Sequence, residues 1–130
     1  MRLLALLLLL GQAAADEDPG FELVRGAAPA LKVRQSATLS LSIVPHAGHR
    51  ILAAGPVTVH LRGEGVKPQR PLYHRDEAVD PRADVPRFEL QVTAEKSGPA
   101  RLEAHCTFYL CRGDLCRPIE TAITFTLEVS

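Results

Sequence analysis

Short stretches in which apolar and polar residues alternate recur along most of the chain. Between residues 37 and 44, leucine and isoleucine at positions 39, 41 and 43 alternate with threonine and serine. A period of two directs one side of a β-strand into a core and the other side into water. The same alternation marks other candidate strands, at residues 57–61, 87–92, 100–111 and 119–129, with shorter ones at 21–24 and 31–33.

Glycine and proline residues separate these stretches, and no 3.6-residue periodicity is visible after the first 15 residues. About seven short strands in about 110 residues match the dimensions of an immunoglobulin domain. We therefore expect residues 21–130 to form an all-β, immunoglobulin-like antiparallel β-sandwich. Residues 66–87 carry four prolines and many charges, which favours an irregular loop that contacts a partner or covers a site.

The first 15 residues have the three parts of a cleavable secretory signal. A positive charge at Arg2 precedes the apolar run 3–10, and small residues follow at 13–15. A membrane-spanning helix needs roughly 20 apolar residues, so this run is too short to be an anchor. The pattern predicts a signal peptide at 1–15, a flexible start at 16–20 and an exported protein, periplasmic or secreted and bacterial, that is not inserted in the membrane after cleavage.

Charge and motifs exclude several classes of function. Fifteen basic residues balance 15 acidic ones, which does not favour binding to nucleic acid or to an anionic membrane. Hydrolase motifs and phosphate-binding glycine loops are not visible, and we expect no cofactor. The histidines lack zinc-ligand spacing, so we expect no metal site among them: His46, His49, His60, His74 and His105.

The most informative segment contains two of the three cysteines. Four residues separate Cys111 from Cys116, and Gly113-Asp114 between them is typical of a tight turn. A hairpin would place the two cysteines opposite or nearly opposite each other. Opposed residues have Cα atoms about 4.5–5.5 Å apart, and a disulfide accepts about 4.4–6.8 Å. The geometry therefore permits a bridge, which an oxidising compartment favours.

The third cysteine lies on the other side of the same candidate strand. Cys106 precedes Cys111 by five residues, so a straight strand directs the two side chains to opposite faces. It shares a face with Phe108 and Leu110, which indicates a buried cysteine that packs as a small apolar residue. The alternative is a resolving thiol for the pair at the hairpin tip.

Two roles are open for a bridge between Cys111 and Cys116. As a structural cross-link of such a short loop, it would contribute roughly 2 kcal/mol of stability. As an exposed bridge at a hairpin tip, it would be accessible to the thiolate of a partner, which is typical of labile, catalytic disulfides. Arg112 and Arg117 favour a thiolate nearby, whereas Asp114 opposes one. The residues alone leave both roles open.

The segment 109–118 resembles a known family. Its pattern is an aromatic residue, Tyr109, then Cys111, four residues, Cys116 and Pro118, followed by a final alternating strand. It is similar to the amino-terminal, immunoglobulin-like domain of the thiol:disulfide interchange protein DsbD and to free-standing periplasmic domains related to it. The stretch 43–51, with its proline, glycine and histidines, is also similar to the corresponding part of that family.

The resemblance implies a reversible disulfide that passes electrons between exported proteins, with Cys111 and Cys116 as the catalytic pair. Phe108, Tyr109 and Pro118 would shield the bridge or contact the partner. The partners implied are other periplasmic thiol or disulfide proteins, either thioredoxin-like or a membrane electron carrier. The alternative is a non-enzymatic periplasmic binding or interaction module in which the same disulfide is structural.

Overall fold

The computed structural model describes residues 18–130, and the predicted signal peptide at 1–15 lies outside the described residues. Nine β-strands and one short 3-10 turn occur within 18–130. Their bounds are β1 Phe21–Arg25, β2 Ser36–Pro45, β3 Arg50–Ile51, β4 Thr58–Glu64, β5 Val66–Pro68, β6 Leu72–His74, η1 Arg75–Glu77, β7 Arg87–Ala94, β8 Gly98–Arg112 and β9 Leu115–Val129. Within the same range, no helix has the length and apolar character needed to cross a bilayer.

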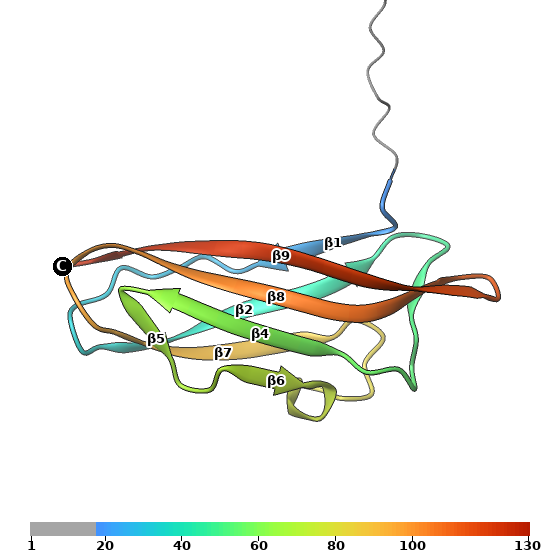
Figure 1. The fold of residues 1–130 in the computed structure, drawn as a ribbon, viewed down its shortest axis with the longest axis horizontal. Coiled ribbons are helices and arrows are strands. Elements are labelled where there is room, and N and C mark those ends of the chain that lie inside the picture. The colour runs from blue at the N-terminus through green and yellow to red at the C-terminus, as the bar shows by residue number, and fades with distance from the viewer. Residues whose placement is uncertain (1–17) are drawn as a thin grey trace, which may run out of the picture.

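The strands form two antiparallel sheets that face each other (Figure 1). One sheet has the order β1-β2-β7-β5, and the other contains β6, β4, β8 and β9 in sequence across the sheet. The two-residue strand β3 lies along the same edge of β8 as β4, but nearer to the β8–β9 turn. The expected immunoglobulin-like, all-β antiparallel sandwich is therefore confirmed.

Alternating apolar side chains from both sheets fill the space between them. Leu39, Leu41 and Ile43 of β2 are buried, while the residues between them face outward, as the alternation predicted. Phe88 and Leu90 of β7 are fully buried against them. Removing such side chains from water is the main favourable contribution to folding.

The longest element is the β8–β9 hairpin, in which two 15-residue strands pair in one continuous register. Gly113 has a φ of 60°, which the first central position of a type II′ turn requires and glycine adopts without steric cost. The tip of this hairpin projects beyond the ends of the neighbouring strands, opposite to the end that carries the C-terminus (Figure 1).

Residues 66–87 are more regular than expected. β5 pairs with β7 and β6 pairs with β4, so this segment contributes an outer strand to each sheet. Val66 and Tyr73 are buried where these strands join the core. Strands of three residues are too short for an alternating pattern to be recognised among prolines and charges, which explains why the sequence predicted a loop.

Candidate functional site

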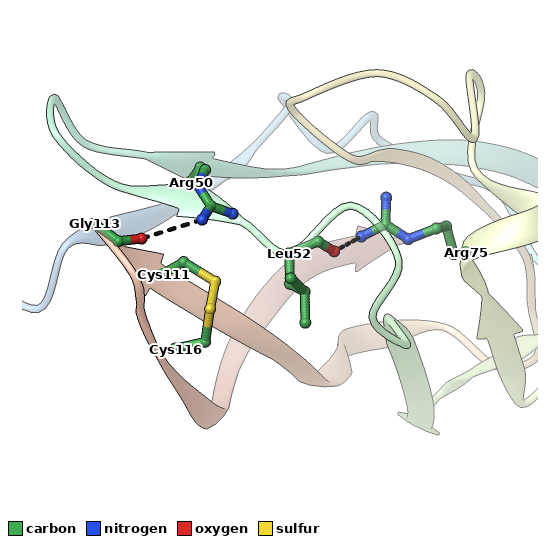
Figure 2. The surroundings of a disulfide bond; sticks show 6 residues. All are labelled: Arg50, Leu52, Arg75, Cys111, Gly113 and Cys116. Carbon is green, nitrogen blue, oxygen red and sulfur yellow. Dashed lines mark hydrogen bonds between the residues drawn. A yellow bond between two sulfur atoms is a disulfide. The ribbon is translucent and has the colours of Figure 1, made fainter.

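The disulfide at the tip of the β8–β9 hairpin is the candidate site. The two-residue turn fixes the register, so that Arg112 pairs with Leu115 and Cys111 pairs with Cys116. A disulfide joins the two cysteines, whose Cα atoms lie 3.9 Å apart (Figure 2). This separation is shorter than the range expected from the sequence, and it is nearest to that of opposed residues without mutual hydrogen bonds, which approach closest in antiparallel sheets. The hairpin therefore holds the two sulfur atoms together by its own geometry.

The two cysteines differ in their exposure to solvent. Cys111 is fully buried, whereas Cys116 is exposed. Cys111 lies on an inner strand at this point, because Arg50 of β3 pairs with it on the side away from β9. Cys116 lies on β9, the outer strand of the sheet. A thiolate from solvent therefore reaches Cys116 and not Cys111.

Arg50 also crosses the hairpin tip. Its Nη2 atom donates a hydrogen bond to the carbonyl oxygen of Gly113 at 3.1 Å (Figure 2). The residue that carries this positive charge is also the one that pairs with Cys111 across the edge of β8. A nearby cation stabilises a thiolate, which opposes the destabilising effect of burial on a thiolate at Cys111. Arg50 was not singled out from the sequence, because the two-residue strand that carries it shows no alternation.

The structure brings two of the three expected flanking residues to the face that carries the bridge. Tyr109 pairs with Pro118 in the register next to the cysteines, on the outward face of the sheet, and Tyr109 is 38% exposed. Phe108 points the opposite way, into the core, where its ring packs edge-to-face on Phe21 with centroids 5.2 Å apart. Phe108 therefore supports the hairpin from inside and does not lie over the bridge.

Cys106 lies in the core, on the inward face of β8, as the spacing from Cys111 predicted. Burial raises the pKa of its thiol to about 12, because desolvation disfavours the thiolate. This position between the sheets does not suit a resolving thiol for the bridge, because Cys111 faces outward. Cys106 packs as a small apolar residue.

A cluster of charged residues that the sequence did not reveal lies beside the hairpin. Asp18 Oδ1 accepts hydrogen bonds from the Gly20 N–H at 2.8 Å and from His46 Nδ1 at 2.6 Å. His46 Nε2 lies 3.5 Å from Glu22. The Gly20 hydrogen bond and the His46 contact lower the pKa of Asp18, and the Asp18 hydrogen bond raises the pKa of His46. His46 lies 28 positions after Asp18 in the sequence, and no recognisable spacing links the two.

Gly20 joins this cluster to the hairpin by close contact. Its φ is 91°, and a Cβ atom there would lie 2.6 Å from His49 Cδ2 and 2.9 Å from Leu110 Cδ2. Only glycine fits both the backbone conformation and the space. The start of the described chain is therefore fixed against the base of the hairpin tip, and Arg117 of β9 donates to the Pro19 carbonyl oxygen at 2.8 Å.

A groove of about 470 Å³ opens between this N-terminal segment and the hairpin tip. Its walls combine apolar, basic and acidic side chains with one member of the disulfide: Asp18, His49, Leu110, Arg112, Leu115, Cys116 and Arg117. Leu115 is 81% exposed. Within residues 18–130, no group of three or more histidine, cysteine or acidic side chains is placed to hold a metal ion.

The segment expected to cover the bridge contacts it only indirectly. Arg75 donates a hydrogen bond to the carbonyl oxygen of Leu52 at 2.9 Å (Figure 2). It donates a second one to the carbonyl oxygen of Gly55 at 3.2 Å. The Leu52 N–H in turn donates to the Tyr109 carbonyl oxygen at 2.9 Å. Arg75 therefore positions the segment after β3, and that segment flanks the hairpin.

Comparison with known proteins gives no family for this chain. No protein-family model matches it, and no curated protein sequence matches it. Among solved structures, it is similar to AggA, the major subunit of aggregative adherence fimbriae type I from Escherichia coli. The two share 10% sequence identity with a TM-score of 0.43, over 92% of this chain and 100% of the fimbrial subunit. A likeness at this level does not bear on function.

Proposed function

We propose that this chain is an exported thiol–disulfide exchange domain that passes electrons between periplasmic proteins through the Cys111–Cys116 disulfide. The observation that carries the proposal is the asymmetry of the bridge: Cys116 is exposed on an outer strand, and Cys111 is buried beside Arg50. Exposed disulfides next to cations are the readily exchanged ones. The predicted signal peptide supports an oxidising location, where such chemistry takes place.

The geometry favours one order of events. The thiolate of a reduced partner attacks Cys116 Sγ, the S–S bond breaks, and its electron pair leaves on Cys111 Sγ. Arg50 stabilises this leaving thiolate until it takes up a proton. A second thiolate of the partner then attacks the partner's own sulfur in the mixed disulfide and releases Cys116 as a thiolate. Overall, two electrons and two protons move from the partner dithiol to this domain.

The reverse sequence passes the electrons to an oxidised partner, because each exchange step is reversible. The partners proposed are thioredoxin-like proteins or a membrane electron carrier with reactive cysteines. Tyr109 and Pro118 lie on the face that carries the bridge and would contact these partners beside the sulfur atoms. Cys106 has no role in the exchange, because it lies in the core.

A second candidate is a binding or interaction module in which the bridge is a structural cross-link. The complete burial of Cys111 and the Arg50–Gly113 hydrogen bond favour it, because they protect one half of the bridge. The stabilisation expected for such a short loop is roughly 2 kcal/mol.

The reduction potential of the bridge separates the two candidates. Equilibration in glutathione redox buffers, read by thiol alkylation and mass spectrometry, should give a value above about −300 mV for an exchange domain. A lower value would rule out the exchange function. The Cys111→Ser, Cys116→Ser double variant provides a control: an exchange domain keeps its fold and loses thiol exchange, whereas a cross-linked module keeps its partner and melts earlier.

A further inference from the structure

The groove beside Cys116 combines two features that suit a peptide ligand. We infer that it binds an extended segment of the exchange partner in which the reactive cysteine is flanked by an apolar residue and by acidic residues. This inference rests on the proposed exchange function and adds the chemistry by which the partner is recognised.

The apolar feature comes from the hairpin register. Leu110 faces Arg117, and Arg112 faces Leu115, so these four side chains share the side of the hairpin that is directed toward the groove. Leu110 is buried and packs closely on Gly20 at the base of the groove, while Leu115 is 81% exposed at the tip. Covering an exposed leucine with an apolar residue of the partner removes apolar surface from water and favours binding.

The charge of the groove selects acidic neighbours. Arg112 and Arg117 contribute two positive charges, and the Arg117 guanidinium donates to a neutral carbonyl oxygen, that of Pro19. The Asp18 carboxylate is already bound by the Gly20 N–H and by His46, whose raised pKa favours the positively charged imidazolium. The walls are thus basic overall, and carboxylates on the partner complement them.

The position of Cys116 connects binding to chemistry. Cys116 lies between Leu115 and Arg117 on β9 and lines the same groove, but its side chain alternates to the opposite face of the strand. β9 is the outer strand of the sheet, and an extended segment laid along its outer edge alternates in the same way. The apolar and acidic residues of such a segment then face the groove, and the cysteine between them faces the exposed half of the bridge. The positive walls also attract the attacking group itself, because a thiolate is an anion. Binding in the groove therefore raises the local concentration of the reacting sulfur.

The test uses two blocked tetrapeptides, Asp-Leu-Cys-Glu and Lys-Leu-Cys-Lys, and follows mixed-disulfide formation with the oxidised protein by mass spectrometry. Each rate is divided by the thiolate concentration and by the rate with 2-mercaptoethanol. The ratio of the normalised rate with the acidic peptide to that with the basic peptide should fall about tenfold in the Arg112→Gln, Arg117→Gln variant and at high salt. The intrinsic difference between the peptides cancels in this comparison. Arg62→Gln, a matched change at an exposed arginine elsewhere in the sheet, should leave the ratio unchanged.

A second measurement does not depend on exchange. In the Cys111→Ser, Cys116→Ser variant, methyl NMR shifts of Leu110 and Leu115 should respond to the acidic peptide with serine in place of cysteine, and respond at least fivefold less to the basic one. Equal responses, or an unchanged rate ratio in the arginine variant, would overturn the inference while leaving the exchange function intact.

Failure of the bridge to react even with 2-mercaptoethanol would count against the exchange function instead. The NMR measurement would still show whether the groove binds the acidic peptide. The other candidate ligand for the groove is a second copy of the chain. A dimer in sedimentation equilibrium that Leu115→Ser dissociates would assign the groove to self-association and overturn the inference.

Discussion

Arg50 and Gly113 are joined across the hairpin tip by a hydrogen bond of 3.1 Å, although they are 63 positions apart in the sequence. Arg50 also pairs with Cys111, so the contact keeps a guanidinium group at the hairpin tip, close to the half of the bridge that would leave as a thiolate. The rate of exchange should therefore depend on a residue that belongs to neither cysteine strand.

Replacing Arg50 tests this dependence. Arg50→Gln should raise the pKa of the Cys111 thiol in the reduced protein and slow reduction by dithiothreitol about three- to tenfold, because a more basic leaving group departs more slowly. Absorbance of the thiolate at 240 nm gives the pKa, and stopped-flow kinetics give the rate. Arg50→Lys keeps the charge and should retain most of the rate. An unchanged rate and pKa in Arg50→Gln would show that the cation does not act on the bridge.

The exposure of the two cysteines predicts unequal reactivity in single variants. With Cys111→Ser, the remaining Cys116 thiol should form a mixed disulfide with oxidised glutathione at least about tenfold faster than Cys111 does in Cys116→Ser, because only Cys116 is exposed. Mass spectrometry of quenched samples gives both rates. In denaturant the two thiols should react alike, and a difference that persists there would assign the effect to local sequence instead of to burial.

Gly20 should tolerate substitution less well than another glycine with a similar backbone conformation. Gly20→Ala places a methyl group against His49 and Leu110 at a φ of 91°, whereas a methyl group at Gly48, where φ is 84°, would meet no other atom within 4 Å. We expect Gly48→Ala to cost about 1 kcal/mol from backbone strain alone and Gly20→Ala about 1–3 kcal/mol more. Urea unfolding measures both. Equal costs would mean that the N-terminal segment is not fixed against the hairpin.

The Asp18–His46 pair predicts a dependence on pH. The pKa of His46 in the folded protein is raised above 6.5. The charged imidazole therefore contributes fully to the stability of the fold below pH 6.5, and this contribution is lost as the pH rises through the folded pKa. The folded pKa of Asp18 is lowered below 3.8, so its contribution is present above that pH and is lost as the pH falls through the folded value. The contact should therefore be strongest between these limits.

Proton NMR titration of the His46 ring checks the assignment. Asp18→Asn should bring the pKa of His46 back toward 6.5, whereas Glu22→Gln should change it less, because the hydrogen bond from Asp18 is the larger cause. A larger effect of Glu22→Gln would mean that Glu22, and not Asp18, is the main cause of the raised pKa of His46.

The alternating leucines of β2 and the turn at Gly113 were sufficient to predict the sandwich and the opposed cysteines, because period-two patterning and turn chemistry act locally. The five-residue separation of Cys106 from Cys111 correctly predicted that Cys106 lies on the inward face of its strand. The asymmetry of the bridge could not be predicted, because it depends on β3, a strand of two residues that pairs with β8 from the far side. The contact between Asp18 and His46 likewise arises only when the β1–β2 pairing brings two distant segments together.

The bridge is mounted on a hairpin whose two strands remain paired from the tip to the opposite end of the sandwich. A shift of one residue would turn every core side chain of β8 outward, so the register cannot respond to the state of the sulfur atoms. We therefore expect the backbone of the hairpin to be the same before and after electron transfer. A partner that distinguishes the oxidised from the reduced domain must do so at the two sulfur atoms themselves, and the remaining contacts set affinity equally for both forms.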